Sequence, residues 1–193
     1  RKLAEPHGRT GRPTQVGKEF GIVKASAVAL IAGRRAHRSQ MTQAKTGLAD
    51  KPVVISCGEP SGIGPEVAAR AWAMLAGEVP LAWIGDPRHL PPDIPHCIID
   101  SPSDALAAGS DALPVLRHDF AASAVAGKPD PANAQGVIDV IARGVDLVRS
   151  GAASALTTAP IHKKALKDGA GFAYPGHTEY LAALAGGSDV VMM

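Results

Sequence analysis

The side chains best suited to chemistry lie in two short polar stretches, at residues 160–164 and 175–179. The first contains His162 and two lysines, and the second, Pro-Gly-His-Thr-Glu, presents the imidazole of His177 beside the hydroxyl of Thr178. An imidazole and a hydroxyl side by side can hold a phosphate or a hydroxyl group of a small molecule. The alternative for His177 is a structural role, in which its ring bonds to a nearby backbone carbonyl.

These polar stretches are placed by the predicted elements around them. Residues 155–158 form a short apolar run that is predicted to be a strand, and Pro160 ends it because proline cannot donate to a sheet ladder. The second polar stretch leads into residues 180–184, which are predicted to be helical. In open parallel α/β sheets, ligands bind outside the carboxyl ends of the strands, where helix N-termini offer N–H groups to anions. We therefore expect a small phosphorylated or carboxylated ligand at this place.

The start of the acidic part of the chain has the order strand, glycine loop and helix. Residues 53–57 form a β-branched run, and residues 67–75 continue as a helix after the loop. The spacing of Gly58, Gly62 and Gly64 fits neither the dinucleotide fingerprint nor the phosphate-binding P-loop. We interpret the loop as a tight strand-to-helix turn at the opening of a doubly wound sheet, with ligand contact as the alternative.

The clearest predicted helix spans residues 134–149. Asn133 is a suitable N-cap, an apolar stripe follows, and Gly151 is a natural stop. This helix should pack on the sheet and form a strand-helix-strand crossover that leads to the polar stretches. The irregular, proline-rich sequence between residues 89 and 113 leaves the order of the secondary-structure elements there open. Further strands are predicted at residues 81–85, 97–99, 115–117 and 189–193.

Charge divides the chain into a basic and an acidic part. Residues 1–50 hold 10 of the 20 Lys+Arg and 3 of the 18 Asp+Glu, which gives +7 there and −5 over residues 51–193. We interpret residues 1–50 as a basic, disordered tail with Met41 as the native start, and an Arg-rich targeting peptide is the alternative. The apolar run at residues 20–33 is too short and too polar to span a bilayer. The acidic part has no clustered lysines and arginines of the kind that bind nucleic acid.

Several classes of site are not expected within this chain. Cys57 and Cys97 are the 2 cysteines, and their spacing fits neither a metal nor a redox motif, so we predict a reduced, cytoplasmic location. The 7 histidines form no recognised metal pair, and no serine-hydrolase elbow is present. The sequence therefore predicts no metal site built from this chain alone, and it leaves the catalytic and cofactor-binding residues unassigned. A core of Ala, Val, Leu and Ile is expected because aromatic residues make up 4% of the chain.

Four motifs, taken in order, resemble those of the 4-hydroxythreonine-4-phosphate dehydrogenase family of pyridoxine biosynthesis. They are Gly-Glu-Pro-Ser-Gly-Ile-Gly-Pro-Glu at residues 58–66, Thr-Ala-Pro-Ile-His-Lys at 158–163, Pro-Gly-His-Thr-Glu at 175–179 and Val-Val-Met-Met at 190–193. The resemblance covers residues 50–193 and less than half of the family's length. We therefore expect residues 51–193 to be the N-terminal part of such a dehydrogenase, cut at a strand.

The resemblance implies an α/β fold like that of the isocitrate and isopropylmalate dehydrogenases, with a largely parallel sheet, flanking helices and a homodimeric assembly. It also implies oxidation of 4-phosphooxy-threonine with NAD(P)⁺, followed by decarboxylation to 3-amino-2-oxopropyl phosphate. His177 and Thr178 match the residues that contact substrate in the family. The family's divalent metal is held by three histidines in later motifs that this chain does not contain. We therefore expect the full-length protein to be the dehydrogenase and residues 1–193 alone to be inactive.

Three alternatives remain open from the sequence. A sister activity of the same family would oxidise threonate or erythronate 4-phosphate, which differ from the amino substrate at C2. A second alternative is an inactive fragment with weak anion binding, and an acyl- or phosphotransferase on a related fold is a weaker third. For the enzyme interpretations the expected partner is a small phosphorylated substrate, with neither nucleic acid nor membrane involved.

Overall fold

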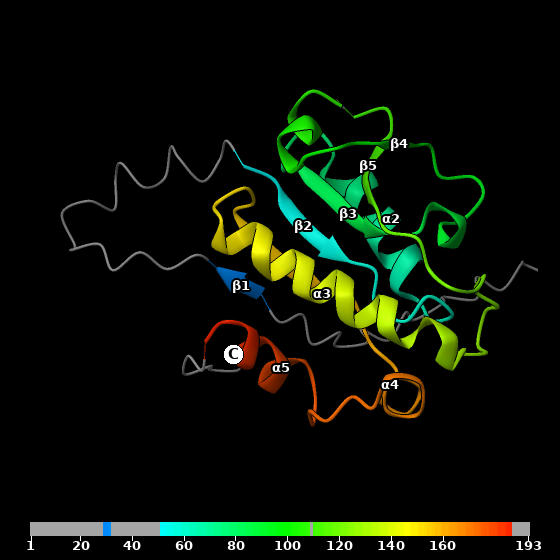
Figure 1. Cartoon of the computed structure of the whole chain (residues 1–193). Coiled ribbons are helices and arrows are strands. Elements are labelled where there is room, and N and C mark those ends of the chain that lie inside the picture. Colours follow the sequence, from blue (N-terminus) through cyan, green and yellow to red (C-terminus); the bar gives the residue numbers. More distant parts are fainter. Residues whose placement is uncertain (1–28, 32–50, 109, 187–193) are drawn as a thin grey trace, which may run out of the picture.

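A single β-sheet forms the centre of the molecule (Figure 1). The computed structural model describes residues 29–31, 51–108 and 110–186. The six strands follow the order β1-β6-β2-β3-β5-β4, in which β2 to β6 are parallel to their neighbours and β1 runs antiparallel to β6. The strands are β1 Ala29–Ile31, β2 Val53–Ser56, β3 Leu81–Gly85, β4 His96–Ile98, β5 Leu113–Arg117 and β6 Ala155–Thr158.

Three of the predicted strands, β2, β3 and β6, lie where the apolar runs place them, although β2 ends at Ser56 rather than at residue 57. β4 begins one residue earlier than predicted, and β5 begins at Leu113 and includes Pro114. Pro114 fits inside this strand because β5 pairs with β3 only from Val115 onward, so its missing N–H interrupts no bond to that neighbour. The lone proline therefore hid the first half of β5 from a pattern-based prediction.

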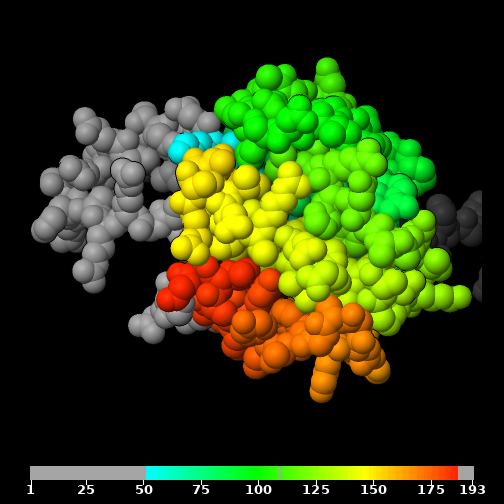
Figure 2. Space-filling model, in the orientation of Figure 1, coloured from blue at the N-terminus to red at the C-terminus, as the bar shows by residue number. Residues whose placement is uncertain are grey.

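Helices cover both faces of the sheet. α2 (Gly64–Leu75) connects β2 to β3 and α3 (Ala134–Arg149) connects β5 to β6, so the two crossovers run across the sheet in opposite directions. Since such crossovers are right-handed, the two helices lie on opposite faces, as Figure 1 shows. α4 (Lys163–Ala170) and α5 (His177–Leu184) pack against α3, and Figure 2 shows them in orange and red along its border. The short 3₁₀ turns are η2 Pro87–His89, η3 Pro102–Leu106 and η4 Pro131–Asn133.

The core lies between the sheet and the helices α2 and α3, and its buried residues are mostly aliphatic, as the composition predicts. The apolar stripe of α3 is confirmed, because Val137, Ile141, Val145 and Val148 are buried. Asn133 is the N-cap residue of this helix, as predicted, but its side chain makes no capping hydrogen bond. Its side chain instead accepts a hydrogen bond from the backbone N–H of residue 122 at 2.8 Å, which ties the loop after β5 to the start of α3.

Parts of the sequence interpretation fall outside the described residues. These include most of the basic tail, Met41 and the strand predicted at residues 189–193, so the predicted disorder, start site and last strand stay predictions. Within the tail, β1 adds to the edge of β6. In the described part of the chain, no helix has the length and apolar character that a membrane crossing requires.

Close packing of helices predicts two unequal glycine substitutions. A Cβ on Gly169 in α4 would lie 2.0 Å from the backbone oxygen of Pro131, whereas one on Gly144 in α3 would lie 2.6 Å from the side-chain tip of Leu156. Although Ala is favoured over Gly in a helix by about 1 kcal/mol, we expect Gly169→Ala to lower the free energy of unfolding by about 2–3 kcal/mol. Gly144→Ala should cost about 1 kcal/mol, because the Leu156 side chain can shift. Urea unfolding of both variants measures the difference, and equal costs would contradict the assigned packing.

Candidate functional site

The chain takes opposite directions at the carboxyl ends of β2 and β6. β2 leads into α2 on one face of the sheet, and its neighbour β6 leads into α4 on the other face. In open α/β sheets, such a topological switch point leaves a crevice in which ligands bind. The first polar stretch directly follows β6 at this point. The second stretch approaches the first, since Lys163 Nζ lies 3.6 Å from the position of a Cβ on Gly176.

The glycine loop after β2 is joined to the segment after β6. The backbone N–H of Glu59 donates to the carbonyl of Pro160 at 2.8 Å. Gly58 adopts a left-handed conformation, with φ +69, and a Cβ there would lie 2.4 Å from the Pro160 oxygen. A Cβ on Gly64 would likewise lie 2.3 Å from the carbonyl oxygen of Cys57. The contacts of Gly58 and Gly64 are therefore with the chain itself, as the interpretation of a tight turn requires.

The first polar stretch forms the start of α4. His162 caps the helix, since its Nδ1 accepts a hydrogen bond from the backbone N–H of Ala165 at 3.1 Å. Lys164 forms an ion pair with Asp168 one turn later on the exposed side. Lys163 instead extends toward the second polar stretch, where its Nζ lies 3.6 Å from the position of a Cβ on Gly176.

Aromatic rings hold the second polar stretch against the protein. Phe172, Tyr174 and Tyr180 form a cluster in which the rings of Phe172 and Tyr180 meet edge to face, 5.3 Å apart, and Tyr174 lies 5.0 Å from Tyr180. At the far end of α5, the Arg149 guanidinium of α3 donates to the carbonyl of Leu184 at 2.7 Å. α5 is therefore fixed at both ends by contacts outside the polar stretch.

His177 and Thr178 are the first two residues of α5, three residues before the predicted helix start. Their backbone N–H groups lie in the first turn, where no carbonyl of the same helix can accept from them. Both residues are half-buried. Among the described residues, no group bonds to the buried Nε2 of His177. Burial lowers the pKa of the His177 imidazole, and the positive charge of Lys163 lowers this pKa further.

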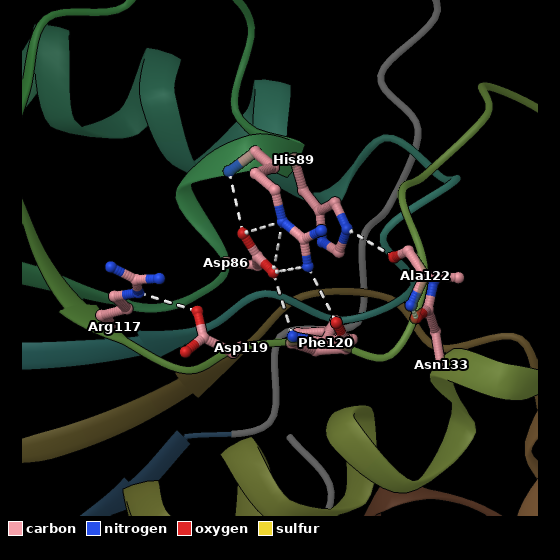
Figure 3. Close-up of polar contacts among 8 residues, drawn as sticks. Asp86, His89, Arg117, Asp119, Phe120, Ala122 and Asn133 are labelled. Atoms are coloured by element: carbon pink, nitrogen blue, oxygen red, sulfur yellow. Dashed lines mark hydrogen bonds and ion pairs between the residues drawn. The ribbon is translucent and has the colours of Figure 1, made fainter.

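A second polar cluster lies beyond the ends of β3 and β5 (Figure 3). Its centre is the buried carboxylate of Asp86, which accepts from the Arg88 guanidinium at 2.6 Å and from the backbone N–H of Phe120 at 3.0 Å. The Arg88 guanidinium also donates to the Phe120 carbonyl at 2.8 Å. His89 Nε2 donates to the Ala122 carbonyl at 3.2 Å. These bonds fasten the segment after β5 to the turn after β3.

The charge of Asp86 is stabilised by its neighbours. Burial by itself raises the pKa of this carboxyl group, but the hydrogen bonds from Arg88 and from the backbone N–H of Phe120 outweigh it and hold the pKa well below its usual range. The sequence predicted a strand at residues 81–85 and gave no role to Asp86 directly after it, so this cluster was missed. The available signal was an Asp directly before a proline, an arrangement in which Asp caps a short helix, as Asp86 caps η2 here.

A family model described as "Pyridoxal phosphate biosynthetic protein PdxA" matches residues 74–193 of the chain. The chain belongs to this family. The matched region contains α3, β6, α4 and α5, and therefore both polar stretches at the switch point.

Relatives within the PdxA family carry the same name. The 4-hydroxythreonine-4-phosphate dehydrogenase of Roseobacter denitrificans is 63% identical over 146 residues, which are 75% of this chain and 45% of the relative. The enzyme of that name from Ruegeria sp. is 58% identical over 145 residues, which are 75% of this chain and 44% of the relative. The chain thus spans about half the length of the curated relatives it matches.

Solved structures of the PdxA family share the fold. The 4-hydroxythreonine-4-phosphate dehydrogenase of Klebsiella pneumoniae matches with a TM-score of 0.61 and 30% identity, over 69% of this chain and 44% of that one. The enzyme from Burkholderia phymatum matches with a TM-score of 0.65 and 26% identity, over 72% of this chain and 44% of that one. The predicted fold is confirmed: the chain is a part of an α/β protein of the isocitrate and isopropylmalate dehydrogenase type.

The PdxA resemblance implies a divalent metal, but the described part of the chain contains no set of ligands for it. No group of three or more His, Cys, Asp or Glu side chains is placed there to hold an ion. We therefore assign no residue of this chain to a metal.

Titration of His177 tests the geometry of the site. We predict that its ring titrates below the ordinary histidine value of about 6.5, because burial and the Lys163 charge both disfavour the imidazolium ion. Lys163→Gln should raise the midpoint only in part, since burial is the larger cause. The ring Cε1–H resonance, followed by NMR against pH, measures both midpoints. An unchanged midpoint in Lys163→Gln would place the ammonium group elsewhere.

Loss of the Asp86 carboxylate should destabilise the fold. We expect Asp86→Asn to lower the free energy of unfolding at pH 7 by about 3 kcal/mol, because Arg88 and the backbone N–H of Phe120 lose a charged partner. Since the folded pKa is depressed, this contribution is full above the ordinary carboxyl pKa of about 3.9 and is lost as the pH falls below it. Urea unfolding at several pH values measures it. Asp119→Asn is the matched control, because its ion pair with Arg117 is exposed, and its effect should be near zero.

Proposed function

We propose that, in a protein of its relatives' length, this chain forms the substrate-binding part of an NAD(P)-dependent 4-hydroxythreonine-4-phosphate dehydrogenase of pyridoxal phosphate biosynthesis. The observation that carries the proposal is the position of His177 and Thr178 in the first turn of α5 beside the switch point. Membership of the PdxA family and the names of the relatives support the same function.

The reaction follows from the substrate named in those relatives. The carbon that bears the 3-hydroxyl of 4-phosphooxy-threonine transfers a hydride to the nicotinamide of NAD(P)⁺, and the hydroxyl proton is released. The resulting β-keto acid then loses carbon dioxide and leaves 3-amino-2-oxopropyl phosphate. In this scheme His177 and Thr178 bind and orient the substrate by hydrogen bonds from the ring, the hydroxyl and the free N–H groups of the helix start.

The bound form of His177 is part of the proposal. Its ring is neutral near pH 7, because burial and Lys163 lower its pKa, so it carries one N–H donor and one acceptor. The buried Nε2 has no partner among the described residues, which leaves it available to a ligand. The divalent metal and the nicotinamide would bind through residues outside those described. We further propose a cytoplasmic homodimer with no nucleic acid or membrane partner.

A chimera tests the proposed function. Residues 51–193 would replace the matching N-terminal part of the Roseobacter denitrificans relative, which is 63% identical to this chain there. With 4-phosphooxy-threonine, NAD⁺ and a divalent metal, we expect NADH formation by the chimera and none by residues 1–193 alone. Loss of a group that hydrogen-bonds the substrate costs about 10²-fold or more, so His177→Ala and Thr178→Ala should lower kcat/KM of the chimera by about that factor.

The same assay separates the sister activities. Threonate and erythronate 4-phosphate, offered in parallel, should be turned over more slowly than the amino substrate. A chimera that prefers either of them would refute the proposed substrate. NADH formation by residues 1–193 alone would refute the proposal that this part is inactive. His162→Ala is the control, since it removes a helix cap rather than a substrate contact.

A further inference from the structure

Lys163 is the charged side chain of α4 that faces the second polar stretch. Its Nζ lies 3.6 Å from the position of a Cβ on Gly176, and no side chain stands there because Gly176 is the residue before α5. The ammonium group is close enough to His177 for its charge to act on the ring. Lys163 and His177 come from different helices, so the fold and not the local sequence brings them together.

The neighbouring lysine has a different environment. Lys164 forms its ion pair with Asp168 within α4. Lys163 forms no ion pair or hydrogen bond with any other described residue. A carboxylate oxygen of Glu179 lies 3.5 Å from the same Gly176 Cβ position, but it forms no ion pair with Lys163. A cation beside a half-buried ring, with no ion pair to a described carboxylate, is suited to an anion from outside the protein.

We propose that Lys163 is a substrate-binding residue whose ammonium group holds an oxyanion of the substrate, its phosphate or its carboxylate, next to the His177 ring. The buried Nε2 of His177 lacks a partner among the described residues and supplies the second contact. The N–H groups in the first turn of α5 add the positive end of a helix dipole. This inference rests on the proposed function for the identity of the substrate, but the anion site itself can be tested without turnover.

Three variants of the 193-residue chain provide the test. Lys163→Gln removes the charge, Lys163→Arg keeps it, and Lys164→Gln is the matched control one residue away on the same helix. Inorganic phosphate and acetate are titrated into each protein at constant ionic strength, and the His177 Cε1–H resonance is followed by NMR. Thermal melts show whether each variant is folded like the wild type.

We expect phosphate to shift the His177 resonance of the wild type in a saturable manner. Loss of a charge-assisted hydrogen bond weakens binding by about tenfold or more, so Lys163→Gln should raise the Kd for phosphate by at least that factor. Lys163→Arg should restore most of the affinity, and Lys164→Gln should change the Kd by less than about twofold. Tighter phosphate than acetate binding assigns the site to the substrate's phosphate, and the reverse order assigns it to the carboxylate.

Three results would overturn the assignment of Lys163. They are the absence of saturable binding of either anion by the wild type, equal binding by a folded Lys163→Gln variant, and an equal loss in Lys164→Gln. The chimera separates this inference from the proposed function. Anion binding that depends on Lys163, without substrate-dependent NADH formation, would refute only the function. Turnover with an unchanged KM in Lys163→Gln would refute only the role of Lys163.

Discussion

The structure depends on the close approach of two backbone segments at the ends of β2 and β6. The bond from the Glu59 N–H to the Pro160 carbonyl closes that approach, and it needs Gly58 because any Cβ there would overlap the Pro160 oxygen. The paired strands beneath keep the two segments in register, with Ser56 beside Thr158. With this point fixed, α2 and α4 leave on opposite faces, which makes it a topological switch point of the sheet.

The position of His177 is then set by packing and hydrogen bonds of residues that are not themselves candidates for substrate binding. α5 is short and is attached to α3 by the Tyr180 hydroxyl, which donates to the Ile138 carbonyl, and by Arg149 at its C-terminal end. α4 approaches the start of α3 so closely that Gly169 has no room for a side chain. Both α4 and α5 pack against α3. This packing brings the Lys163 and His177 side chains close together although they belong to different helices. Packing of α4 and α5 on α3 therefore fixes the positions of Lys163 and His177 relative to each other.

Strong local patterns made most of the fold predictable. β3, β6 and α3 follow uninterrupted apolar runs or a clear 3.6-residue stripe, and they lie where the sequence places them. The first half of β5 was not predicted because proline usually interrupts a strand. The pairing of β5 with β3, which begins only at Val115, shows why Pro114 is tolerated. Asn133 was assigned as a helix cap from its residue type, but a tertiary partner, the loop after β5, takes its side chain. Such contacts join residues far apart in the chain, and single-sequence patterns do not contain them.

The site was predictable in its residues but not in its arrangement. Motif resemblance singled out His177 and Thr178, while the helix start was placed three residues late because Gly176 and the polar residues after it resemble a loop. The approach of Lys163 to this stretch was not foreseen, since the side chain of a lysine at a helix start is ordinarily solvated. The Asp86 cluster was missed for a related reason: Asp86 and Phe120 are separated by 34 positions and meet only in the folded sheet.

The two polar clusters at the carboxyl end of the sheet differ in how far the protein satisfies them. Asp86 is saturated, with donors from Arg88 and from two backbone N–H groups, and although His89 keeps one nitrogen without a partner among the described residues, its other nitrogen is bonded to Ala122. A buried carboxylate with every lone pair engaged holds two loops together and has no capacity left for a ligand. At His177, by contrast, the buried Nε2 lacks a partner among the described residues, and the ammonium group of Lys163, which forms no ion pair with them, lies nearby. A buried polar group without a hydrogen-bond partner lowers the stability of the fold. Proteins usually keep such groups where they bind a ligand.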